Sequence, residues 1–356
     1  MRTRTAALAA LLAVATLAGM LPAPAEACTA FSVSTPHGPL LAKGFDWVTG
    51  EGWIVANERG RTRSLLFPGA APNDDGSWTS RFASLSLTTI GPGFPVSGMN
   101  EEGLAIEALV DLHAAPVATA EPGRLTGLEL IQYALDRFAS VEEFADFAAG
   151  ERVTQLAVAL HFFACDRSGA CAVVEPGRDG TRVTRGLQVK ALANNPYRTD
   201  LETMRPNALT RWLGWGGPVP GSSGARFRTV ARAIGSLPPK TAEEGLALLE
   251  KVVMRGRTQW QIVWDLKGRT VLLRQREAGF GTIGLKLDDL EKACAGAPRA
   301  LSIGRTAHAS FAPWSEQDSG LAERAVLLQV GRAGPQASRL AAAVAAATRV
   351  PGCVQP

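Results

Sequence analysis

The first 28 residues restrict this chain more than any other segment. Arg2 and Arg4 precede an apolar stretch over residues 6–21, and the small-residue run Ala-Glu-Ala at 25–27 comes directly before Cys28. A charged start, an apolar stretch and a small-residue end, in this order, are typical of an export signal that is cleaved. Cleavage at that point would make Cys28 the first residue and would expose an α-amine beside its thiol.

Two other functions of this N-terminal segment fit its residues less well. The apolar stretch is shorter than the roughly 20 residues that a membrane-spanning helix needs, and Pro22 and Pro24 end it. A lipidated cysteine is the second alternative, but its signal normally has an aliphatic residue three positions before the cysteine, where this chain has Ala25. We therefore expect cleavage, no stable membrane insertion afterwards, and a periplasmic or secreted protein.

The composition predicts a well-packed globular protein. Hydrophobic residues make up 46% of the chain, charged residues make up 20%, and the formal net charge is only +4. This balance supports a substantial core, excludes a disordered chain and argues against a nucleic-acid partner. We expect a signal peptide over 1–27, one domain over 28–300 and a C-terminal extension over 301–356.

The five cysteines are an odd number, so at least one must remain unpaired in an oxidising compartment. Cys165 and Cys171 flank a short turn segment, and a bond between Cys294 and Cys353 would tie the C-terminal tail to the body. If both pairs form, Cys28 is the free thiol. The alternative is that some of these residues are buried thiols with no partner.

Apolar spacing predicts strands and helices in alternating blocks. Strands are expected over 29–46 with a turn at 36–39, and over 81–89, 98–109, 156–164, 172–175, 259–265 and 270–274. Helices are expected after the capping patterns at 126 and 140, and over 226–234 and 241–254. An Ala-rich helix over 337–347 has no expected function. This order favours sheets covered by segregated helices.

An N-terminal cysteine would contain both a nucleophile and a base. Its α-amine has an ordinary pKa of about 7.7 to 8.0, so near neutral pH it accepts the thiol proton without help from a histidine. Motif spacing alone leaves open that Cys28 follows the cleavage point by chance.

The rival design pairs a cysteine with a histidine. The histidines are His37, His113, His161 and His308, and none has a supporting motif. His161 lies in an apolar run, which is typical of a structural histidine. No His-x-x-x-His or Cys-x-x-Cys spacing is present, so we expect neither a metal nor another cofactor.

Six segments, in order along the chain, carry a resemblance to a known family. They are Cys-Thr-Ala-Phe at 28–31, Ala-Lys-Gly-Phe-Asp-Trp at 42–47, Gly-Met-Asn-Glu-Glu-Gly-Leu at 98–104, Ala-Asn-Asn-Pro at 193–196, Ala-Arg-Phe at 225–227 and Thr-Gln-Trp-x-x-Val-Trp-Asp at 258–265. Together they resemble the choloylglycine hydrolase family, which includes penicillin V acylases and bile salt hydrolases. The resemblance extends from Cys28 to about Leu290.

The resemblance implies the four-layer αββα sandwich of N-terminal-nucleophile hydrolases, an α+β fold. By position it implies that Cys28 is the nucleophile and that Asp46 holds and orients the α-amine. It further implies that Asn194 donates to the oxyanion and that Arg226 favours the thiolate. Without the resemblance, Asn194 would be interpreted as a turn residue before proline and Arg226 as a surface cation.

Two positions depart from the family pattern, and both are expected near the substrate. Lys43 stands where the family often has arginine, so a bidentate contact with substrate or carboxylate is in doubt. Val110 replaces Asn, Tyr or Trp, which preserves a backbone donor for the oxyanion but gives the acyl pocket an aliphatic wall. Trp47 restores some aromatic surface there.

We therefore expect an exported, cofactor-free hydrolase of linear N-acyl amides. Penicillin V-like side chains, N-acyl homoserine lactones and other fatty amides all fit, and conjugated bile acids fit less well. The alternative from another class is a secreted binding protein on the same scaffold that has lost catalysis. Relatives in the family are commonly tetrameric, so a homotetramer is consistent with the resemblance, although the sequence does not determine the number of subunits.

Overall fold

The computed structural model describes most of the chain after Ala27. The described residues are 28–67, 69, 71–72, 75–115, 123–156, 158–205, 219–276, 281–290, 293–294, 296–303, 310–330, 343–344 and 352–353. The expected signal peptide, His308 and all of the Ala-rich stretch except 343–344 lie outside the described residues.

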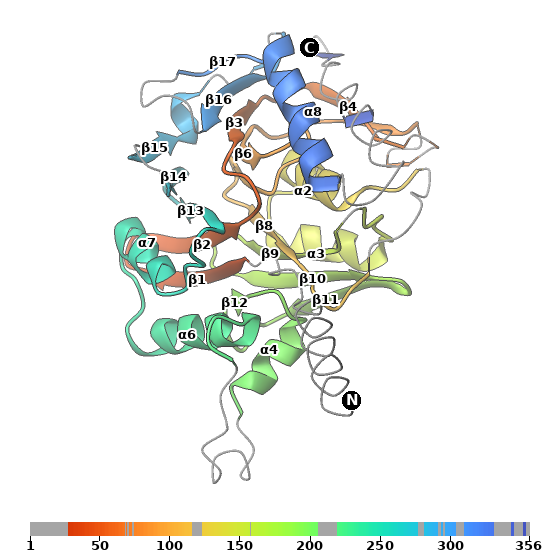
Figure 1. The fold of residues 1–356 in the computed structure, drawn as a ribbon. Coiled ribbons are helices and arrows are strands. Elements are labelled where there is room, and N and C mark those ends of the chain that lie inside the picture. The colour runs from red at the N-terminus through yellow and green to blue at the C-terminus, as the bar shows by residue number, and fades with distance from the viewer. Residues whose placement is uncertain are drawn as a thin grey trace, which may run out of the picture.

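Two antiparallel sheets form the centre of the molecule (Figure 1). The first has the order β12-β1-β2-β13-β14-β15, and the second has the order β11-β10-β9-β8-β7-β6-β3-β16-β17. The strands of the first sheet are β1 (Thr29–Thr35), β2 (Gly38–Asp46), β12 (Ala191–Leu192), β13 (Thr258–Asp265), β14 (Thr270–Gln275) and β15 (Thr282–Lys286). The second contains β3 (Gly52–Asn57), β6 (Ser84–Thr88), β7 (Ser97–Asn100), β8 (Ala105–Val110), β9 (Leu160–Cys165), β10 (Cys171–Gly177), β11 (Gly180–Arg185), β16 (Arg299–Ile303) and β17 (Ala312–Pro313). A small third sheet joins β18 (Gly352–Cys353), β4 (Arg61–Ser64) and β5 (Ser77–Thr79).

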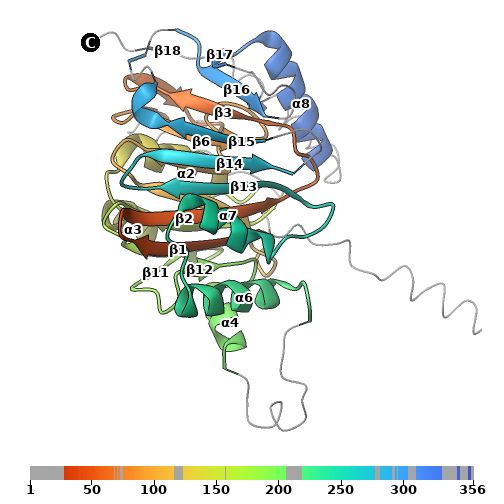
Figure 2. The ribbon, with the colours of Figure 1, turned by 90° about the vertical axis from the view of Figure 1, so that its left-hand side faces the viewer.

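Helices cover the outer faces of both large sheets (Figure 2). The six-stranded sheet is covered by α6 (Ser223–Ser236) and α7 (Ala242–Glu250), with α4 (Tyr197–Thr203) packed against α6. The nine-stranded sheet is covered by α2 (Gly127–Arg137) and α3 (Val141–Gly150). The predicted four-layer αββα sandwich is therefore confirmed.

The layers follow from side chains that alternate along the strands. On β13, Trp260, Ile262 and Trp264 pack into the main core, while Val263 lies under Gly245 of α7. A second cluster fills the space between the nine-stranded sheet and its helices; it includes Ile106 of β8. Both faces of the central strands are therefore buried, which makes the sandwich a rigid support for the strand ends.

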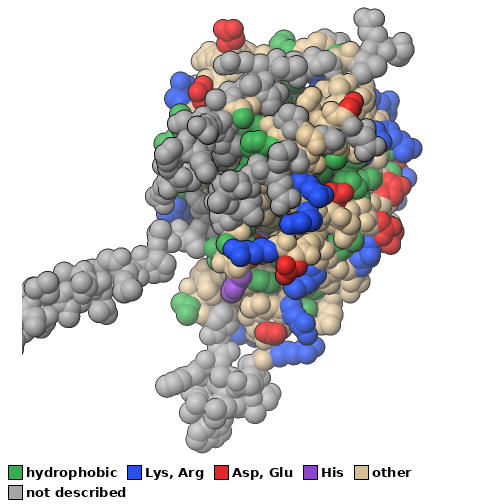
Figure 3. Space-filling view, turned by 90° about the vertical axis from the view of Figure 1, so that its right-hand side faces the viewer, with side chains coloured by type: hydrophobic (Ala, Val, Ile, Leu, Met, Phe, Trp, Pro, Cys, Tyr) green, Lys and Arg blue, Asp and Glu red, His purple; other side chains and the backbone are tan. Residues whose placement is uncertain are grey.

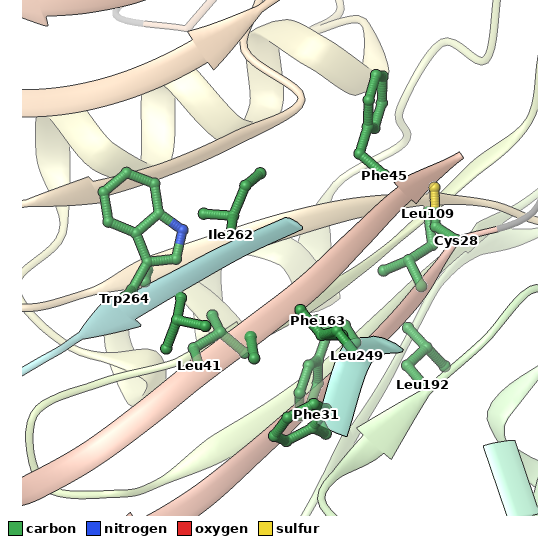
Figure 4. Packing of buried hydrophobic residues seen from close by; sticks show 14 of the residues in the cluster. Cys28, Phe31, Leu41, Phe45, Leu109, Phe163, Leu192, Leu249, Ile262 and Trp264 are labelled. Atoms are coloured by element: carbon green, nitrogen blue, oxygen red, sulfur yellow. The ribbon is translucent and has the colours of Figure 1, made fainter. Parts of the chain in front are cut away.

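The hairpin of β1 and β2 positions the first described residue. Its register pairs Thr29 with Gly44 and Thr35 with Gly38, as the turn signal at 36–39 predicts. Cys28 consequently lies beside the end of β2, next to Asp46. Figure 4 shows Cys28 at the same end of these strands as Phe45, with Leu41 and Trp264 at the opposite end.

The predicted helix starts are confirmed by their caps. Thr126 and Glu129 form a complete capping box at α2, and the side chains of Ser140 and Thr241 accept backbone N–H groups at α3 and α7. These caps satisfy donors that a helix start otherwise leaves unpaired. The segment expected as one strand over 98–109 instead forms β7, a turn and β8.

Of the two alternatives for the cysteines, the structure has the one in which both pairs form. Cys165 bonds to Cys171 across the β9–β10 hairpin, Cys294 bonds to Cys353, and Cys28 is the free and buried cysteine. In the part of the chain that the structure describes, no helix combines the length and apolar character needed to cross a membrane.

The C-terminal part is not separate from the main sheet. β16 pairs with β3, with Leu301 opposite Ile54, so the expected boundary after residue 300 falls inside a strand. After β17 the chain forms α8 (Glu316–Val330), which lies along the edge of the sandwich (Figure 1). Trp53 of β3 donates from Nε1 to Asp318 Oδ1 of α8 over 3.0 Å.

The surface drawn in Figure 3 has basic and acidic side chains close together. The hydrophobic side chains visible there form small groups separated by other side chains and backbone. This mixed pattern agrees with the small formal net charge of +4. We find no long single-sign region on this face of the described residues.

We predict that Gly52→Ala destabilises the fold by about 1–3 kcal/mol because the sandwich cannot accept the added methyl group. A Cβ at Gly52 would lie 2.5 Å from Trp260 Cη2 and 2.7 Å from the carbonyl oxygen of Thr88. Urea unfolding measures the loss. The matched control is Gly150→Ala, because a Cβ there meets no atom within 4 Å. Equal losses in the two variants would contradict the packing argument.

Candidate active site

Cys28 is the centre of the candidate site. Its side chain is only 1% exposed, and burial raises the pKa of the thiol to about 11. The charges of Lys43 and Arg226 and the backbone N–H of Asp46 oppose this rise of the pKa. In the full chain Ala27 precedes Cys28, so the Cys28 nitrogen is a peptide nitrogen and has no basicity with which to accept the thiol proton.

Asp46 ends β2 and is held by a threonine. The Thr258 hydroxyl accepts the N–H of Met254 over 2.9 Å and donates its own proton to Asp46 Oδ1. Among the described residues, the other oxygen, Oδ2, has no hydrogen bond. Burial raises the pKa of Asp46 to about 7, although Thr258 and the charges of Arg226 and Lys43 act in the opposite direction.

Arg226 is a buried cation that links several parts of the site. Nε donates to Thr29 Oγ1 over 3.0 Å, Nη2 donates to Asn194 Oδ1 over 2.8 Å, and Nη1 donates to the Gly221 carbonyl over 2.6 Å. No carboxylate of the described residues forms an ion pair with it. Burial lowers the pKa of Arg226, and the neighbouring Asp46 and Cys28 oppose that effect. Its charge therefore acts on Cys28 and Asp46 without being neutralised by an ion pair with a described carboxylate.

Asn194 is held on both its backbone and its side chain. Ser223 Oγ accepts the N–H groups of Asn194 and Asn195, over 2.7 and 3.0 Å. Arg226 holds the amide oxygen of Asn194, which orients the NH₂ group toward β8, and Nδ2 donates to the Val110 carbonyl over 2.8 Å. An amide NH₂ has two donor hydrogens, so one remains for a ligand.

The backbone of Val110 faces the same side as Asn194. Asp111 N–H donates to the Ala159 carbonyl over 2.9 Å, and the register pairs Val110 with Leu160. Hydrogen-bonded and non-hydrogen-bonded pairs alternate in an antiparallel ladder, so the N–H and C=O of Val110 both point away from β9. Val110 N–H and Asn194 Nδ2 are consequently two neighbouring donors.

Lys43 lies in the core and does not line the pocket. Its side chain is fully buried, with Nζ 3.3 Å from Glu107 Oε2 and donating to the Val96 carbonyl over 2.8 Å. Ser97 and Trp264 donate to the other oxygen of Glu107. Lys43, which the sequence predicts near the substrate, is therefore paired with Glu107 of the facing sheet. A direct contact between Lys43 and substrate stays a prediction.

A deep apolar pocket adjoins the thiol. It encloses about 920 Å³ of empty space, including its opening to solvent, and Cys28, Trp47 and Val110 all line it. The rest of its described wall is mainly hydrophobic: Phe45, Leu66, Ile90, Phe94, Val96, Ala108, Leu128, Leu156, Val158, Leu160, Val326 and Val344, with Gly127 and the polar Thr89, Thr126 and Gln155. Trp47 and Val110 both line this pocket, and their contacts with substrate stay a prediction.

The described histidines do not bond to Cys28. His161 is fully buried, its Nε2 is 2.8 Å from the Ala193 carbonyl, and burial lowers its pKa to about 4. His113 pairs with Asn195, and His37 lies in the β1–β2 turn. Among the described residues, no group of three or more His, Cys, Asp or Glu side chains is arranged to hold a metal.

Three residues that hold the site together were not among those predicted from the sequence. Thr258 holds Asp46, Ser223 holds the backbone of Asn194, and Thr29 accepts a hydrogen bond from Arg226. Thr29 and Thr258 belong to the six quoted segments, so their position offered a signal. Ser223 did not, because its role depends on how the start of α6 packs against the loop after β12.

Comparison with known proteins supports the resemblance that the sequence motifs carry. A family model described as linear amide C-N hydrolases, choloylglycine hydrolase family, matches residues 70–212. The match covers 143 of the 356 residues, and over this segment the chain is similar to that family. The matched segment contains Val110 and Asn194, whereas Cys28, Asp46 and Arg226 lie outside it. The sequence-based resemblance is therefore confirmed, and the enzyme is a hydrolase of linear amides. No curated protein matches the chain.

Solved structures show the same fold. Penicillin V acylase from Agrobacterium tumefaciens is 24% identical with a TM-score of 0.61, covering 77% of this chain and 91% of that one. A mutant conjugated bile acid hydrolase from Clostridium perfringens is 17% identical with a TM-score of 0.61, covering 81% of this chain and 97% of that one. At these identities the likeness supports the fold and leaves the substrate open.

We predict that Asp46 makes the uncleaved full-length chain less stable as the pH rises. Its pKa is about 7 in the folded chain and 3.8 ordinarily, so the folded state holds the proton more firmly. This contribution to stability is fully present below pH 3.8, is lost between about pH 4 and 7, and amounts to a few kcal/mol. Asp46→Asn should remove it, as measured by urea unfolding across this pH range.

The control for this measurement is Asp179→Asn, because Asp179 is exposed in the β10–β11 turn. The decline should also weaken in protein cleaved before Cys28, since an α-ammonium beside Asp46 favours the ionised carboxylate. An identical pH dependence in Asp46→Asn and in the unmodified chain would contradict the assignment.

Proposed function

We propose that the protein is exported, is cleaved between Ala27 and Cys28, and then hydrolyses N-acyl amides with Cys28 as its N-terminal nucleophile. The proposal rests mainly on four features that lie together in the structure. They are the buried thiol of Cys28, the carboxylate of Asp46 that Thr258 holds, the buried cation Arg226, and the two donors of Val110 and Asn194. Cys28 also lies on the wall of the apolar pocket, where an acyl group would place its carbonyl.

In the first half of the proposed reaction, the free α-amine of Cys28 accepts the thiol proton. The thiolate attacks the carbonyl carbon, a C–S bond forms, and the carbonyl oxygen becomes an oxyanion. The remaining Nδ2 hydrogen of Asn194 and the N–H of Val110 donate to this oxyanion. The α-ammonium then gives its proton to the amide nitrogen and the C–N bond breaks. The amine departs, and the acyl group remains on the sulfur of Cys28 as a thioester.

In the second half, water attacks the thioester and gives a proton to the α-amine. The same donors hold the second oxyanion. When the C–S bond breaks, the carboxylic acid is released and the sulfur regains its proton from the α-ammonium. Each proton taken by the amine is thus returned, and no histidine, metal or other cofactor is required.

The charges around Cys28 suit these steps. Asp46 Oδ2 is available to accept a hydrogen bond from the α-amine, because Thr258 occupies only Oδ1. An ionised carboxylate at that place raises the basicity of the amine. Arg226 favours the thiolate over the neutral thiol and stabilises negative charge as it develops.

The pocket supports aliphatic acyl groups. Most of its described wall consists of Leu, Ile and Val side chains, with Phe45, Trp47 and Phe94 as its aromatic members. Long-chain fatty amides, N-acyl homoserine lactones among them, match this wall better than phenoxyacetyl amides do. Conjugated bile acids remain a further candidate substrate class. The alternative of a non-catalytic binding protein is disfavoured because Asn194 and Arg226 are both present and bonded to each other.

The test is a panel of amides with aliphatic, phenoxyacetyl and bile-acid acyl groups, assayed on secreted protein. We expect the aliphatic amides to be hydrolysed fastest. Cys28→Ser should remove turnover of every amide without unfolding the protein, as checked by circular dichroism. Faster cleavage of phenoxyacetyl amides would overturn the acyl preference, and unchanged turnover in Cys28→Ser would overturn the nucleophile.

Intact-mass and N-terminal sequencing of the same secreted protein test the cleavage step. Cys28 should be the first residue and should react with a thiol reagent. Active protein that retains residues before Cys28, or that carries lipid on its sulfur, is incompatible with the proposal.

We also predict that Asn194→Ala lowers kcat by about 10²- to 10³-fold, the typical loss of one oxyanion donor. Steady-state kinetics with an aliphatic amide measures this loss. The matched control is the adjacent Asn195→Ala, because Asn195 Nδ2 donates to Asp200 at 2.7 Å and does not contact Val110. Asn195→Ala should retain most of its kcat; losses of equal size would argue against an oxyanion role for Asn194.

A further inference from the structure

Part of the wall of the apolar pocket is built by the C-terminal part of the chain. Val326 of α8 and Val344 are 1% and 2% exposed, and they form one cluster with Phe94. Three partly buried residues, Leu66, Ile90 and Leu128, pack against this cluster, and all six side chains line the pocket.

This cluster is distinct from the wall around the thiol. Cys28, Phe45, Trp47 and Val110 belong to the main core, which does not include Val326 or Val344. Leu128 packs against both clusters and so joins them. The wall of the pocket therefore has two parts: one around Cys28, made by the central sheets, and one to which the C-terminal segment contributes.

The C-terminal segment is firmly attached to the sandwich on one side of Val326. Trp53 bonds to Asp318, its ring lies 5.1 Å from that of Trp314, and Ala322 packs into the same cluster as Trp53. Ala322 and Val326 are four residues apart and share a helix face. The contacts of Trp53 thereby orient Val326 toward the pocket.

The segment is attached again after Val344. Cys353 bonds to Cys294, and β18 pairs with β4, with Gly352 opposite Thr62. Both ends of the segment that contributes Val326 and Val344 are thus held to the body of the protein. The part of the pocket wall to which Val326 and Val344 contribute is therefore fixed in place and can restrict how long a bound ligand is.

The described wall of the pocket contains no charged side chain. Of its polar residues, Gln155 exchanges hydrogen bonds with the backbone of Leu160, and the Thr126 hydroxyl caps α2. These two groups already have partners in the protein, so apart from Thr89 the described lining beyond Cys28 offers an apolar surface to an acyl chain.

We propose that the distal part of an unbranched aliphatic acyl chain packs against Val326 and Val344, and that the C-terminal segment thereby selects acyl chain length. This inference rests on the proposed function, in which the acyl carbonyl lies at Cys28. Every methylene buried in the pocket contributes about 0.8 kcal/mol, or roughly a fourfold change in kcat/KM. A larger or smaller side chain at residue 326 should therefore move the length optimum.

The test compares Val326→Phe and Val326→Ala on amides of straight-chain acids of increasing length. In Val326→Phe, the ratio of kcat/KM for the longest to the shortest acyl chains should fall by roughly tenfold or more, because about two methylene groups lose their place. In Val326→Ala, the optimum should move to longer chains. The matched control is Leu328→Phe on the same helix, since Leu328 is 71% exposed, and its length profile should equal that of the unmodified enzyme.

The shortest amides serve as the internal standard for folding. If Val326→Phe loses activity equally at all lengths, or keeps the original profile, the C-terminal segment only completes the core and the inference is overturned. If the unmodified enzyme hydrolyses no amide, the proposed function fails instead. Calorimetric binding of the free straight-chain acids then gives the same length comparison, and an unchanged profile in Val326→Phe overturns the inference there too.

Discussion

The pairing of β1 with β2 is the constraint on which the whole site depends. Its register brings the residue before β1 beside the residue that ends β2, so Cys28 and Asp46 meet although 17 positions separate them along the hairpin. The hairpin is buried between the facing sheet and the helix layer, and β13 pairs with β2. A shift of one residue would turn every buried side chain of β1 to the opposite face, so the position of Cys28 is coupled to the stability of the core.

Buried charge is the second organising feature. Desolvation raises the pKa of Cys28 and Asp46 and lowers that of Arg226, so each group resists its charged form. The charge of Arg226 opposes this effect at Cys28 and Asp46, whereas the charge of Asp46 raises the pKa of Cys28 further. None of the three is neutralised by a direct ion pair with another described side chain. Lys43 differs, because Glu107 holds it in the core. A new charge at the site can therefore be stabilised by a group that has no ion pair: an α-ammonium by Asp46, and an oxyanion by Arg226.

The layers, the β1–β2 and β13–β14 hairpins and the capped helices could be predicted from sequence, because alternation and caps are local signals. The two disulfides were only one of the alternatives that the cysteine count left open, and Cys294 and Cys353 are 59 residues apart. Lys43 was placed near substrate, whereas the structure pairs it with Glu107, a residue of the other sheet that no local pattern connects to it. Val344 was in a stretch without an expected function, yet it lines the pocket. Both results depend on contacts between segments far apart in sequence.

The sequence by itself determined the chemical groups: one unpaired cysteine after a signal-like segment, an aspartate at a strand end, and the family motifs that contain Asn194 and Arg226. Those signals survive in a linear chain because they depend on residue type and short spacing. Only the tertiary structure decided that the N–H of Val110 and Nδ2 of Asn194 lie side by side, and that a segment distant in sequence completes the pocket. Such relations arise when sheets and helices bury their apolar faces against one another, and packing depends on three-dimensional shape that short sequence patterns do not encode.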